Sequence, residues 1–399
     1  MRHSVLLRSQ GKLDAIIGNS NEYSDTKISG SKGINEIHKN NGDGTFSSVK
    51  GGTFTEGRGG NDWNGRNTMS IALADYDGDG DLDILTGNVG HENELHDNDG
   101  NGIFTRIEGL TNSISVGATG TQSVAWMDFD GDGNLDAITG DTTATGVISG
   151  KRLIHRNEGN GKFKIANSFS YKRTDEIHIA DINGDGLPDI YFGGDSELYH
   201  NAGGGSYVSA LGSSVTARIT ASEHALFLDF DGDGDLDVVV GGSPRGAPSH
   251  LELHRNDGGG AFTRMLDAGS ITASNRFEQW MRMAVVDWNN DGYTDVFVGF
   301  LCCVDNHLHR NNGDGTFTNV ATKGSLKRGS GGWGHTADIA FGDYNNDGLI
   351  DAVTRGWSGY KLHKNEGDDV FSMINEADSG LEGINSGGTG QGKFAWGKH

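Results

Sequence analysis

"ADYDGDGDLDILTG" (residues 74–87) places five aspartates within nine positions and then runs directly into a β-branched stretch. Carboxylates packed this densely repel one another unless a cation neutralises them. Close or looser copies of the stretch recur at 128–140, 181–193, 229–241, 287–299 and 343–356. The first aspartates of successive copies are 53, 53, 48, 58 and 56 residues apart, which indicates an internal repeat.

A second motif follows each acidic stretch. It begins with Leu-His-x-Asn or a close variant, continues through a glycine-rich turn and ends on Phe or Tyr, at 95–104, 154–163, 198–207, 253–262, 308–317 and 362–371. A seventh copy, "IHKNNGDGTF" (37–46), follows "GKLDAIIG" (11–18), which matches only the back half of the acidic stretch. The chain therefore contains seven units of about fifty residues, one of them with a degraded acidic loop.

Composition fits one closed array of repeats across residues 1–399 rather than two or three unrelated domains. The 66 glycines and three prolines suit many tight turns between short strands. No stretch approaches the roughly 20 apolar residues of a membrane helix, and the apolar centre of "MRHSVLLRSQG" is too short for a secretory signal. Cys302 and Cys303 are adjacent, so we expect no disulfide framework.

The net charge of −23 argues against a nucleic-acid partner, which requires a basic surface. This charge is unevenly distributed. Of the 55 acidic residues, 21 are aspartates at the repeated positions of the six loops, which leaves 34 acidic residues against 32 basic ones. The acidity is therefore local, and bound cations are the expected counter-charge.

The donor spacing within each loop predicts a metal site. Oxygen-bearing side chains recur at positions 1, 3, 5 and 9, a glycine stands at position 6, and the backbone carbonyl of position 7 is a natural fifth donor. Asn183, Asn289 and Asn345 replace aspartate at position 3 and still offer an oxygen. An all-oxygen, carboxylate-rich set favours Ca²⁺ over Mg²⁺.

The alternative, aspartate-rich turns without an ion, explains a single copy better than six copies with one donor spacing. We therefore expect about six calcium sites. The predicted ligands at positions 1, 3, 5, 7 and 9 are Asp75, Asp77, Asp79, Asp81 and Asp83; Asp128, Asp130, Asp132, Asn134 and Asp136; Asp181, Asn183, Asp185, Leu187 and Asp189; Asp229, Asp231, Asp233, Asp235 and Asp237; Asp287, Asn289, Asp291, Tyr293 and Asp295; and Asp343, Asn345, Asp347, Leu349 and Asp351.

The degraded loop is predicted to bind no ion. If Asp14 is its position 9, then positions 1, 3 and 5 fall on Leu6, Arg8 and Gln10, which lack a carboxylate. Arg8 is a candidate for a positive charge that replaces the ion.

Strand patterns flank each loop. A β-branched run follows the loop, another apolar run precedes it, the Leu-His-x-Asn segment reads as a third strand, and the Phe or Tyr opens a fourth. Four antiparallel strands in each of seven units, with no helical period, predict an all-β, seven-bladed β-propeller. A parallel β-helix has shorter repeats, and a β-sandwich would not show seven copies.

The paired signature, Asp-x-Asp-Gly-Asp-Gly-x-x-Asp followed by Asn-x-Gly-x-Gly-x-Phe, resembles the FG-GAP/VCBS repeats of integrin α-subunit propellers and of many secreted bacterial and algal proteins. The resemblance covers nearly the whole chain. It implies a calcium-binding propeller whose metal loop joins the innermost strand of each blade to the second strand. It says almost nothing about activity.

Both chain ends carry a candidate inner strand. "KFAWGKH" (393–399) aligns with "IAFGDYN" (339–345), an innermost strand that runs into its loop. We therefore expect the C-terminal strand to complete the blade whose outer strands begin near residue 12, so that the two ends of the chain close the ring and no sheet edge is left open. "SVLL" (4–7) is the alternative occupant of that position.

The connections on the face opposite the loops differ from unit to unit, and recognition commonly uses variable loops on a rigid scaffold. These connections are 18–33, 50–68, 140–151, 241–250 and 299–307. Candidate ligand contacts on or near this face are Trp63, Trp280, Trp333, His335 and Trp357. Packing between blades is the alternative role for these tryptophans, whereas Trp126 and Trp396 are expected in the core.

The histidines of the Leu-His-x-Asn segment recur once per unit and are therefore expected to be structural. They are His38, His96, His155, His254, His309 and His363. His178, His224 and His335 are better placed to lie near the ring axis. No nucleophile elbow, phosphate-binding loop or His-Glu-x-x-His helix is present in the sequence.

Three functions fit these features. The favoured one is an extracellular or cell-surface binding or adhesion module for a glycan or protein ligand, without catalysis and without a membrane span. The second is a structural subunit of an extracellular assembly or filament. The third is a propeller-type polysaccharide lyase or hydrolase, which needs a cluster of His, Tyr or Arg at the axis.

Overall fold

A computed structural model describes most of the chain. The described residues are 4–9, 12–18, 35–43, 45–56, 68–107, 113–115, 120–141, 151–159, 161–169, 174, 176–194, 197–210, 222–242, 250–273, 281–300, 305–320, 324–327, 336, 338–356, 359–374 and 394–396. Within this part of the chain, no helix is long and apolar enough to cross a membrane.

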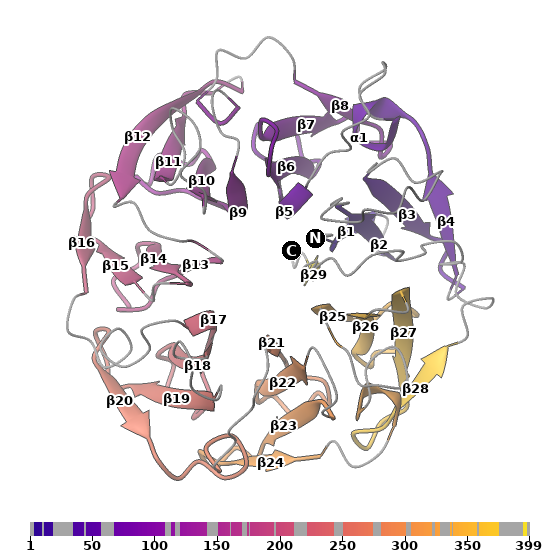
Figure 1. Ribbon diagram of the computed structural model, residues 1–399, viewed down its shortest axis with the longest axis vertical. Helices are drawn as coiled ribbons and strands as arrows, with labels where there is room; N and C mark the ends of the chain where they lie inside the picture. The colour runs from indigo at the N-terminus through magenta and orange to yellow at the C-terminus, as the bar shows by residue number, and fades with distance from the viewer. Residues whose placement is uncertain are drawn as a thin grey trace.

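Seven sheets stand around a central axis as the blades of a propeller (Figure 1). Blade 1 consists of β1 (Ser4–Ser9), β2 (Lys12–Ile17), β3 (Glu36–Asn40), β4 (Phe46–Val49) and β29 (Phe394–Trp396). Blade 2 consists of β5 (Thr68–Ala74), β6 (Asp83–Asn88), β7 (Glu94–Asn98) and β8 (Phe104–Arg106). Blade 3 consists of β9 (Thr121–Met127), β10 (Asp136–Asp141), β11 (Arg152–Asn157) and β12 (Phe163–Phe169).

The other four blades repeat this order. Blade 4 consists of β13 (Ile177–Ala180), β14 (Asp189–Phe192), β15 (Glu197–Asn201) and β16 (Tyr207–Ser209). Blade 5 consists of β17 (Ser222–Leu228), β18 (Asp237–Gly242), β19 (His250–Asn256) and β20 (Phe262–Met265). Blade 6 consists of β21 (Met281–Val286), β22 (Asp295–Phe300), β23 (His307–Asn311) and β24 (Phe317–Asn319). Blade 7 consists of β25 (Asp338–Gly342), β26 (Asp351–Gly356), β27 (Gly359–Asn365) and β28 (Phe371–Ile374).

Blades 2 to 7 are four-stranded, and neighbouring strands within each of them pair antiparallel. The first strand of each blade lies nearest the axis and the fourth lies at the rim (Figure 1). The helices are short: α1 (Gly52–Glu56) and the 3₁₀ turn η1 (Ser325–Lys327) lie in segments that link one blade to the next. The predicted seven-bladed, all-β propeller is confirmed.

Ring closure differs in detail from the prediction. In blade 1 the first antiparallel strand is β1, which pairs with β2 from Ser4↔Ile17 to Ser9↔Lys12, and β29 lies at the inner edge of the sheet beyond it. The C-terminal strand β29 instead adds a fifth strand, parallel to β1, and it also contacts β25 of blade 7. Only two residues separate β1 from β2, so this hairpin forms locally, whereas a strand from the far end of the chain has to close a much longer loop.

The hydrophobic core lies between blades. All six residues of β6, β10 and β22 are buried, because both faces of a second strand pack against neighbouring sheets. In one such layer Val239 and Leu253 of blade 5 pack with Val296 and Phe300 of blade 6. Trp126, expected in the core, is half-buried and stacks on Tyr76 with ring centroids 6.0 Å apart. The Trp396 side chain lies outside the description.

Candidate metal loops and the opposite face

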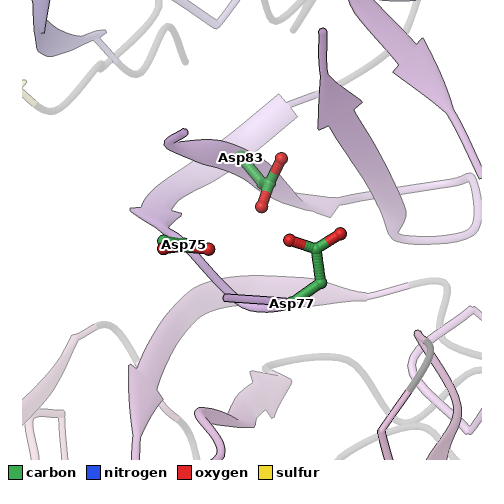
Figure 2. Close-up of side chains that lie close together, drawn as sticks. All are labelled: Asp75, Asp77 and Asp83. Carbon is green, nitrogen blue, oxygen red and sulfur yellow. The ribbon is translucent and has the colours of Figure 1, made fainter. Parts of the chain in front are cut away.

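The six acidic loops connect the first strand of a blade to its second strand, as the family resemblance implied. In blade 2 the loop leaves β5 at Ala74 and ends at Asp83, the first residue of β6. Figure 2 shows the side chains of Asp75, Asp77 and Asp83 turned toward one another across this loop. All six loops share this position between two strands, because position 9 opens the second strand in each copy.

The position 1 carboxylate organises the loop backbone. Asp75 Oδ1 accepts hydrogen bonds from the N–H groups of Gly78 (2.7 Å) and Asp79 (3.1 Å), and its Oδ2 accepts one from Gly80 (3.0 Å). Gly78 and Gly80 have φ of 81° and 97°, in the left-handed region that glycine adopts without strain. The glycines of the motif are therefore required by the turn, and the position 1 carboxylate holds the loop backbone through three hydrogen bonds.

The position 9 aspartate has a structural role that the sequence did not reveal. Asp83 is completely buried, its Oδ1 accepts from the N–H of Asn98 (2.9 Å), and its Oδ2 accepts from the N–H of Tyr76 (3.3 Å). The equivalent bond from the third-strand asparagine is 2.7–2.9 Å in all seven blades, including the one from Asn40 to Asp14 in blade 1. This aspartate therefore ties the second strand to the third whether or not a loop precedes it.

The third-strand asparagine ties neighbouring blades together. Asn157 Nδ2 donates to the carbonyl of Tyr76 in the preceding blade (3.0 Å) and to Leu135 in its own blade (3.1 Å). Equivalent bonds to the preceding blade come from Asn201, Asn256, Asn311, Asn365 and, across the closing seam, from Asn40 to Tyr344. The Asn of the Leu-His-x-Asn motif is thus a link between blades. Its recurrence in every unit was the feature of the sequence from which this role could have been predicted.

Burial disfavours the charged form of the position 9 carboxylates and raises the pKa of those in blades 2, 3, 5, 6 and 7. Burial raises the pKa of Asp83 to about 7, with the charges of Asp77 and Asp97 adding to it, while the N–H bonds from Asn98 and Tyr76 oppose the shift. Burial likewise raises the pKa of Asp136 to about 6 and those of Asp237, Asp295 and Asp351 to about 7. Without a counter-charge, these loops retain protons close to neutral pH.

Three loops already hold a convergent set of carboxylates. Ligand-capable oxygens lie within 4.8 Å of one another in Asp75, Asp77 and Asp83, in Asp128, Asp130 and Asp136, and in Asp229, Asp231 and Asp237. Asp130 Oδ1 and Asp231 Oδ1 are buried and accept no hydrogen bond. A set of hard oxygen donors with buried, unbonded oxygens fits a divalent cation. These acidic clusters can therefore bind a metal ion.

Position 5 lies outside these clusters and bonds within the loop. Asp79 Oδ1 accepts from the N–H of Asp81 (2.9 Å), and the same bond recurs in the other five loops. Where position 3 is asparagine, its amide can satisfy position 5, as Asn289 Nδ2 does with Asp291 Oδ2 (2.8 Å). The carbonyl donors at position 7 stay a prediction.

The degraded loop of blade 1 is replaced by a hairpin. Leu6 and Arg8 lie within β1, and Ser9 pairs with Lys12, so the chain does not form the eight-residue turn of the other blades. Gln10 and the side chain of Arg8 lie outside the description. The predicted charge substitution by Arg8 therefore stays a prediction.

The five candidate ligand contacts, Trp63, Trp280, Trp333, His335 and Trp357, also lie outside the described residues. The same holds for most of the variable connections, at 19–34, 57–67, 142–150, 243–249 and 301–304. Their place on the face opposite the loops and their role in binding both stay predictions.

The third-strand histidines are structural, as predicted. His155 Nδ1 and His309 Nδ1 lie 2.8 Å from Ser113 Oγ and Ser270 Oγ, which belong to the segments that arrive from the preceding blade. Burial lowers the pKa of His155 to about 4. It also lowers the pKa of His309 to about 3, so these rings are neutral at neutral pH. His155 and His309 therefore join their blades to the segments that arrive from the preceding blade.

A polar chain crosses three blades near the axis. Glu176 precedes β13; its Oε2 lies 3.1 Å from His178 Nε2 and its Oε1 lies 2.7 Å from His224 Nδ1 in blade 5. His224 Nε2 in turn contacts the guanidinium of Arg282 in blade 6. Glu176, His224 and Arg282 all stand five residues before a position 1 aspartate, at the end of the inner strand that faces away from the loops.

The sequence alone pointed to His178 and His224 but missed their partners. The repeat position shared by Glu176, His224 and Arg282 carries serine in blades 2 and 3, and there Ser70 Oγ and Ser123 Oγ accept from the N–H groups of Val124 and Ile177 (3.1 Å each). The position therefore serves contact between blades at these five residues, of which two are serines and three are titratable or charged. His178 differs in that its side chain keeps 24% exposure.

Comparison with known proteins places the chain in a family. No curated protein sequence matches it. Among solved structures it is similar to an Agrocybe aegerita lectin described as recognising non-reducing terminal N-acetylglucosamine, with a TM-score of 0.56, 17% identity, and coverage of 87% of this chain and 90% of the lectin. It is also similar to the V. cholerae biofilm matrix protein Bap1, with a TM-score of 0.49, 12% identity, and coverage of 98% and 81% respectively.

At these identities the lectin likeness shows the shared fold alone. The match to a family model is more informative, because it rests on the repeated sequence motif. The model of the FG-GAP-like repeat matches residues 9–86, 75–139, 181–240, 229–298 and 302–354, which together make up well over half of the chain. The chain belongs to the FG-GAP-like repeat family.

Proposed function

We propose that this protein is a calcium-stabilised, non-catalytic binding module that acts outside the cell and holds a glycan or protein ligand on the face opposite its acidic loops. The observation that carries the proposal is the contrast between the two ends of the blades. The turn between first and second strands has eight residues in each of blades 2 to 7. The connection between second and third strands ranges from two residues (357–358) to 18 (18–35).

Calcium is the ion that the constant end suits. Positions 1, 3, 5 and 9, with the carbonyl of position 7, would hold it in each of the six loops, and three loops already bring their carboxylates together. A bound Ca²⁺ supplies two positive charges that offset the repulsion between these carboxylates. Since position 9 is also hydrogen-bonded to the third strand, neutralising it stabilises the junction of three strands.

The variable end suits recognition. Loops of different length on a rigid ring can form a surface that no single repeat encodes, and Trp63, Trp280, Trp333 and Trp357 with His335 offer apolar plates and polar edges there. Stacking on aromatic rings and hydrogen bonding at their margins is the chemistry that sugar rings require. The lectin of similar fold is a precedent for the architecture, and its sugar is not transferred to this chain.

The test is binding to a glycan array in 2 mM CaCl₂ with the whole chain, followed by the same measurement on Trp63→Ala, Trp280→Ala, Trp333→Ala and Trp357→Ala. We expect binding that at least one of these variants weakens about tenfold. Trp288→Phe is the matched control, because that tryptophan is completely buried at a blade interface. If the folded, unmodified protein binds no glycan and no protein from an extracellular extract, the proposal is refuted.

One observation favours a second candidate, a polysaccharide lyase or hydrolase. His178 on the inner strand β13 has one ring nitrogen fixed by Glu176 and keeps partial exposure, which is the arrangement of a histidine oriented by a carboxylate for proton transfer. If this is its role, His178→Ala abolishes cleavage of an acidic or neutral polysaccharide, and His91→Ala, in a connection of blade 2, does not. Absence of cleavage in the unmodified protein would remove this candidate.

A further inference from the structure

Three acidic loops form a natural comparison because their ligand residues are the same. The loops that begin at Asp75, Asp128 and Asp229 carry aspartate at positions 1, 3, 5 and 9, and each brings three carboxylates within 4.8 Å. They differ in the residue between the His and the Asn of the third strand, which we call the flanking residue. It is Asp97 in blade 2, Arg156 in blade 3 and Arg255 in blade 5.

In blade 3 the flanking residue bonds to the loop itself. Arg156 Nε lies 2.9 Å from Asp130 Oδ2, and its second guanidinium nitrogen lies 2.9 Å from Asp132 Oδ2. One guanidinium therefore holds the position 3 and position 5 carboxylates together. An arriving cation has to share these carboxylates with the arginine or displace it.

In blade 5 the same residue type is turned away. Arg255 Nε and its terminal nitrogen lie 2.9 Å and 2.7 Å from Asp257 Oδ1 in the glycine-rich turn. The position 3 carboxylate of this loop, Asp231, keeps a buried Oδ1 that accepts no hydrogen bond. Asp130 Oδ1 of blade 3 is likewise buried and unbonded. The two loops therefore differ in the arginine: Arg156 bonds the second oxygen of the position 3 carboxylate, whereas the bonds of Arg255 go to Asp257.

In blade 2 the flanking residue adds a further acid. Asp97 occupies the place of Arg156, between His96 and Asn98 on β7. The next residue, Asn98, donates its N–H to Asp83 Oδ1 (2.9 Å), so Asp97 lies beside a residue that contacts the loop. Burial and the charges of Asp77 and Asp79 raise the pKa of Asp97. With Asp97, the five aspartates of this loop are joined by a sixth carboxylate, and the flanking position contributes no cation.

We propose that the flanking residue sets the calcium affinity of each loop, so that the blade 2 site fills first, the blade 5 site next and the blade 3 site last of the three. Asp97 acts as an additional acid toward the ion, and Arg156 acts as a built-in competitor for Asp130 and Asp132. The inference rests on the proposed calcium binding and adds a filling order to it. The loops that fill at low calcium hold one part of the ring rigid while blade 3 still responds to rising calcium.

The experiment is a calcium titration of the whole, metal-stripped chain by calorimetry, with native mass spectrometry to count bound ions. Asp97→Asn should weaken the tightest class of sites by about tenfold, because ligand charge strongly tunes calcium affinity. This effect should vanish when the blade 2 loop is disabled by Asp75→Asn with Asp77→Asn. Glu158→Gln, which removes an exposed acid that pairs with Lys164 in a turn of blade 3, should leave that class within about twofold.

Arg156→Ala should tighten one site by about tenfold, and the gain should vanish when Asp128→Asn and Asp130→Asn are added. Arg255→Ala is the matched control and should change affinity by no more than about twofold, since its guanidinium already bonds Asp257. Circular dichroism in excess calcium checks that each variant folds. Equal effects of the two arginine variants, or unchanged affinities while several ions still bind, overturn the filling order alone; absence of calcium binding overturns the proposed function as well.

Discussion

Blade 1 and blade 2 have the same strand order but different inner turns. In blade 2 an eight-residue acidic loop joins the first two strands, whereas in blade 1 a two-residue turn joins β1 to β2. Yet Asp14 of blade 1 keeps the buried bond to Asn40 that Asp83 makes to Asn98. The comparison separates two tasks within one motif: position 9 is needed by the sheet, and positions 1, 3 and 5 are needed by the ion.

The largest expected effect comes from removing Ca²⁺ from the acidic loops of blades 2 to 7, which have no counterpart in blade 1. A ligand at a hundredfold excess over its Kd stabilises the folded state by about 2.7 kcal/mol per site, so six sites contribute on the order of 15 kcal/mol. We expect EDTA to lower the Tm by about 20 °C, on the scale of about 1–2 °C per kcal/mol for a chain of this length. Differential scanning calorimetry measures the change.

Restoration separates calcium from ionic strength. Excess CaCl₂ should return the Tm to its starting value, and MgCl₂ at the same concentration should return only part of it, because Mg²⁺ prefers fewer protein ligands. A Tm that does not change in EDTA would remove the calcium claim for all six loops.

The shared loop pattern explains why so much of the fold could be predicted. Donor residues at fixed spacing mark the turn between two strands, and a turn that recurs seven times, once in degraded form, specifies a ring of blades. Closure was predicted less well. "SVLL" and "FAW" both read as inner strands, and aligning Leu6 and Arg8 with loop positions concealed the hairpin in which they lie.

The site shows the same limit. An aspartate that binds an ion and one that accepts two backbone hydrogen bonds look alike in a sequence, so the second role of Asp83 emerged only from the position of Asn98. The axial chain was hidden for a different reason. Glu176, His224 and Arg282 share a repeat position but no residue type, and their contacts join blades that are 48 and 58 residues apart in the chain.

The second effect concerns pH and arises from the position 9 aspartates whose pKa burial raises, in blades 2, 3, 5, 6 and 7. Burial raises the pKa of Asp83 from 3.8 to about 7, so the folded, metal-free state binds more protons than the unfolded state between pH 4 and pH 7. The contribution of this carboxyl group to the free energy of unfolding is therefore complete below about pH 4 and is lost as the pH rises through 7. Metal-stripped protein should melt at a higher temperature at pH 5 than at pH 8.

Calcium should abolish this slope, because the ion replaces the protons, and calcium affinity should fall as the pH drops from 8 to 5. The measurement is scanning fluorimetry in buffers freed of metal by a chelating resin, with and without CaCl₂. A stripped protein that gains stability between pH 5 and pH 8 would contradict the assigned burial of these carboxylates.

The third effect compares position 9 of blade 1 with position 1 of blade 2. Asp14→Ala leaves the buried N–H of Asn40 without its acceptor, which should cost about 2–3 kcal/mol in both calcium and EDTA. Asp75→Ala should lower the free energy of unfolding much more in calcium than in EDTA, since in EDTA the loss of its three backbone hydrogen bonds is partly offset by removal of a repelling charge. Urea unfolding under both conditions measures the two variants.

Asp14→Asn is the control, because its amide oxygen can still accept the bond from Asn40. It should retain most of the stability that Asp14→Ala loses. If Asp14→Ala is destabilising in calcium alone, the separation of sheet and ion roles drawn from blade 1 is wrong.

The smallest effect lies at the seam between blades. Asn40 Nδ2 donates to the carbonyl of Tyr344 in blade 7 (2.9 Å), whereas the side-chain amide of Asn98 donates to Leu82 within its own blade (3.0 Å). The blade that precedes Asn98 is blade 1, in which β1 leads directly into β2. Blade 1 therefore has no acidic loop whose backbone carbonyl could accept a hydrogen bond from Asn98. Asn40→Ala should therefore lose a link between blades that Asn98→Ala does not lose, a difference of about 1 kcal/mol.

Hydrogen exchange resolves this difference better than melting does, because opening at one seam is a local event. In Asn40→Ala, amides near Tyr344 and in β3 should exchange several-fold faster while blade 4 is unchanged. In Asn98→Ala, faster exchange should stay within blade 2. If both variants accelerate exchange only in their own blade, the asparagine does not join neighbouring blades, and the ring is closed by the strand pairing of β1 with β29 and by packing alone.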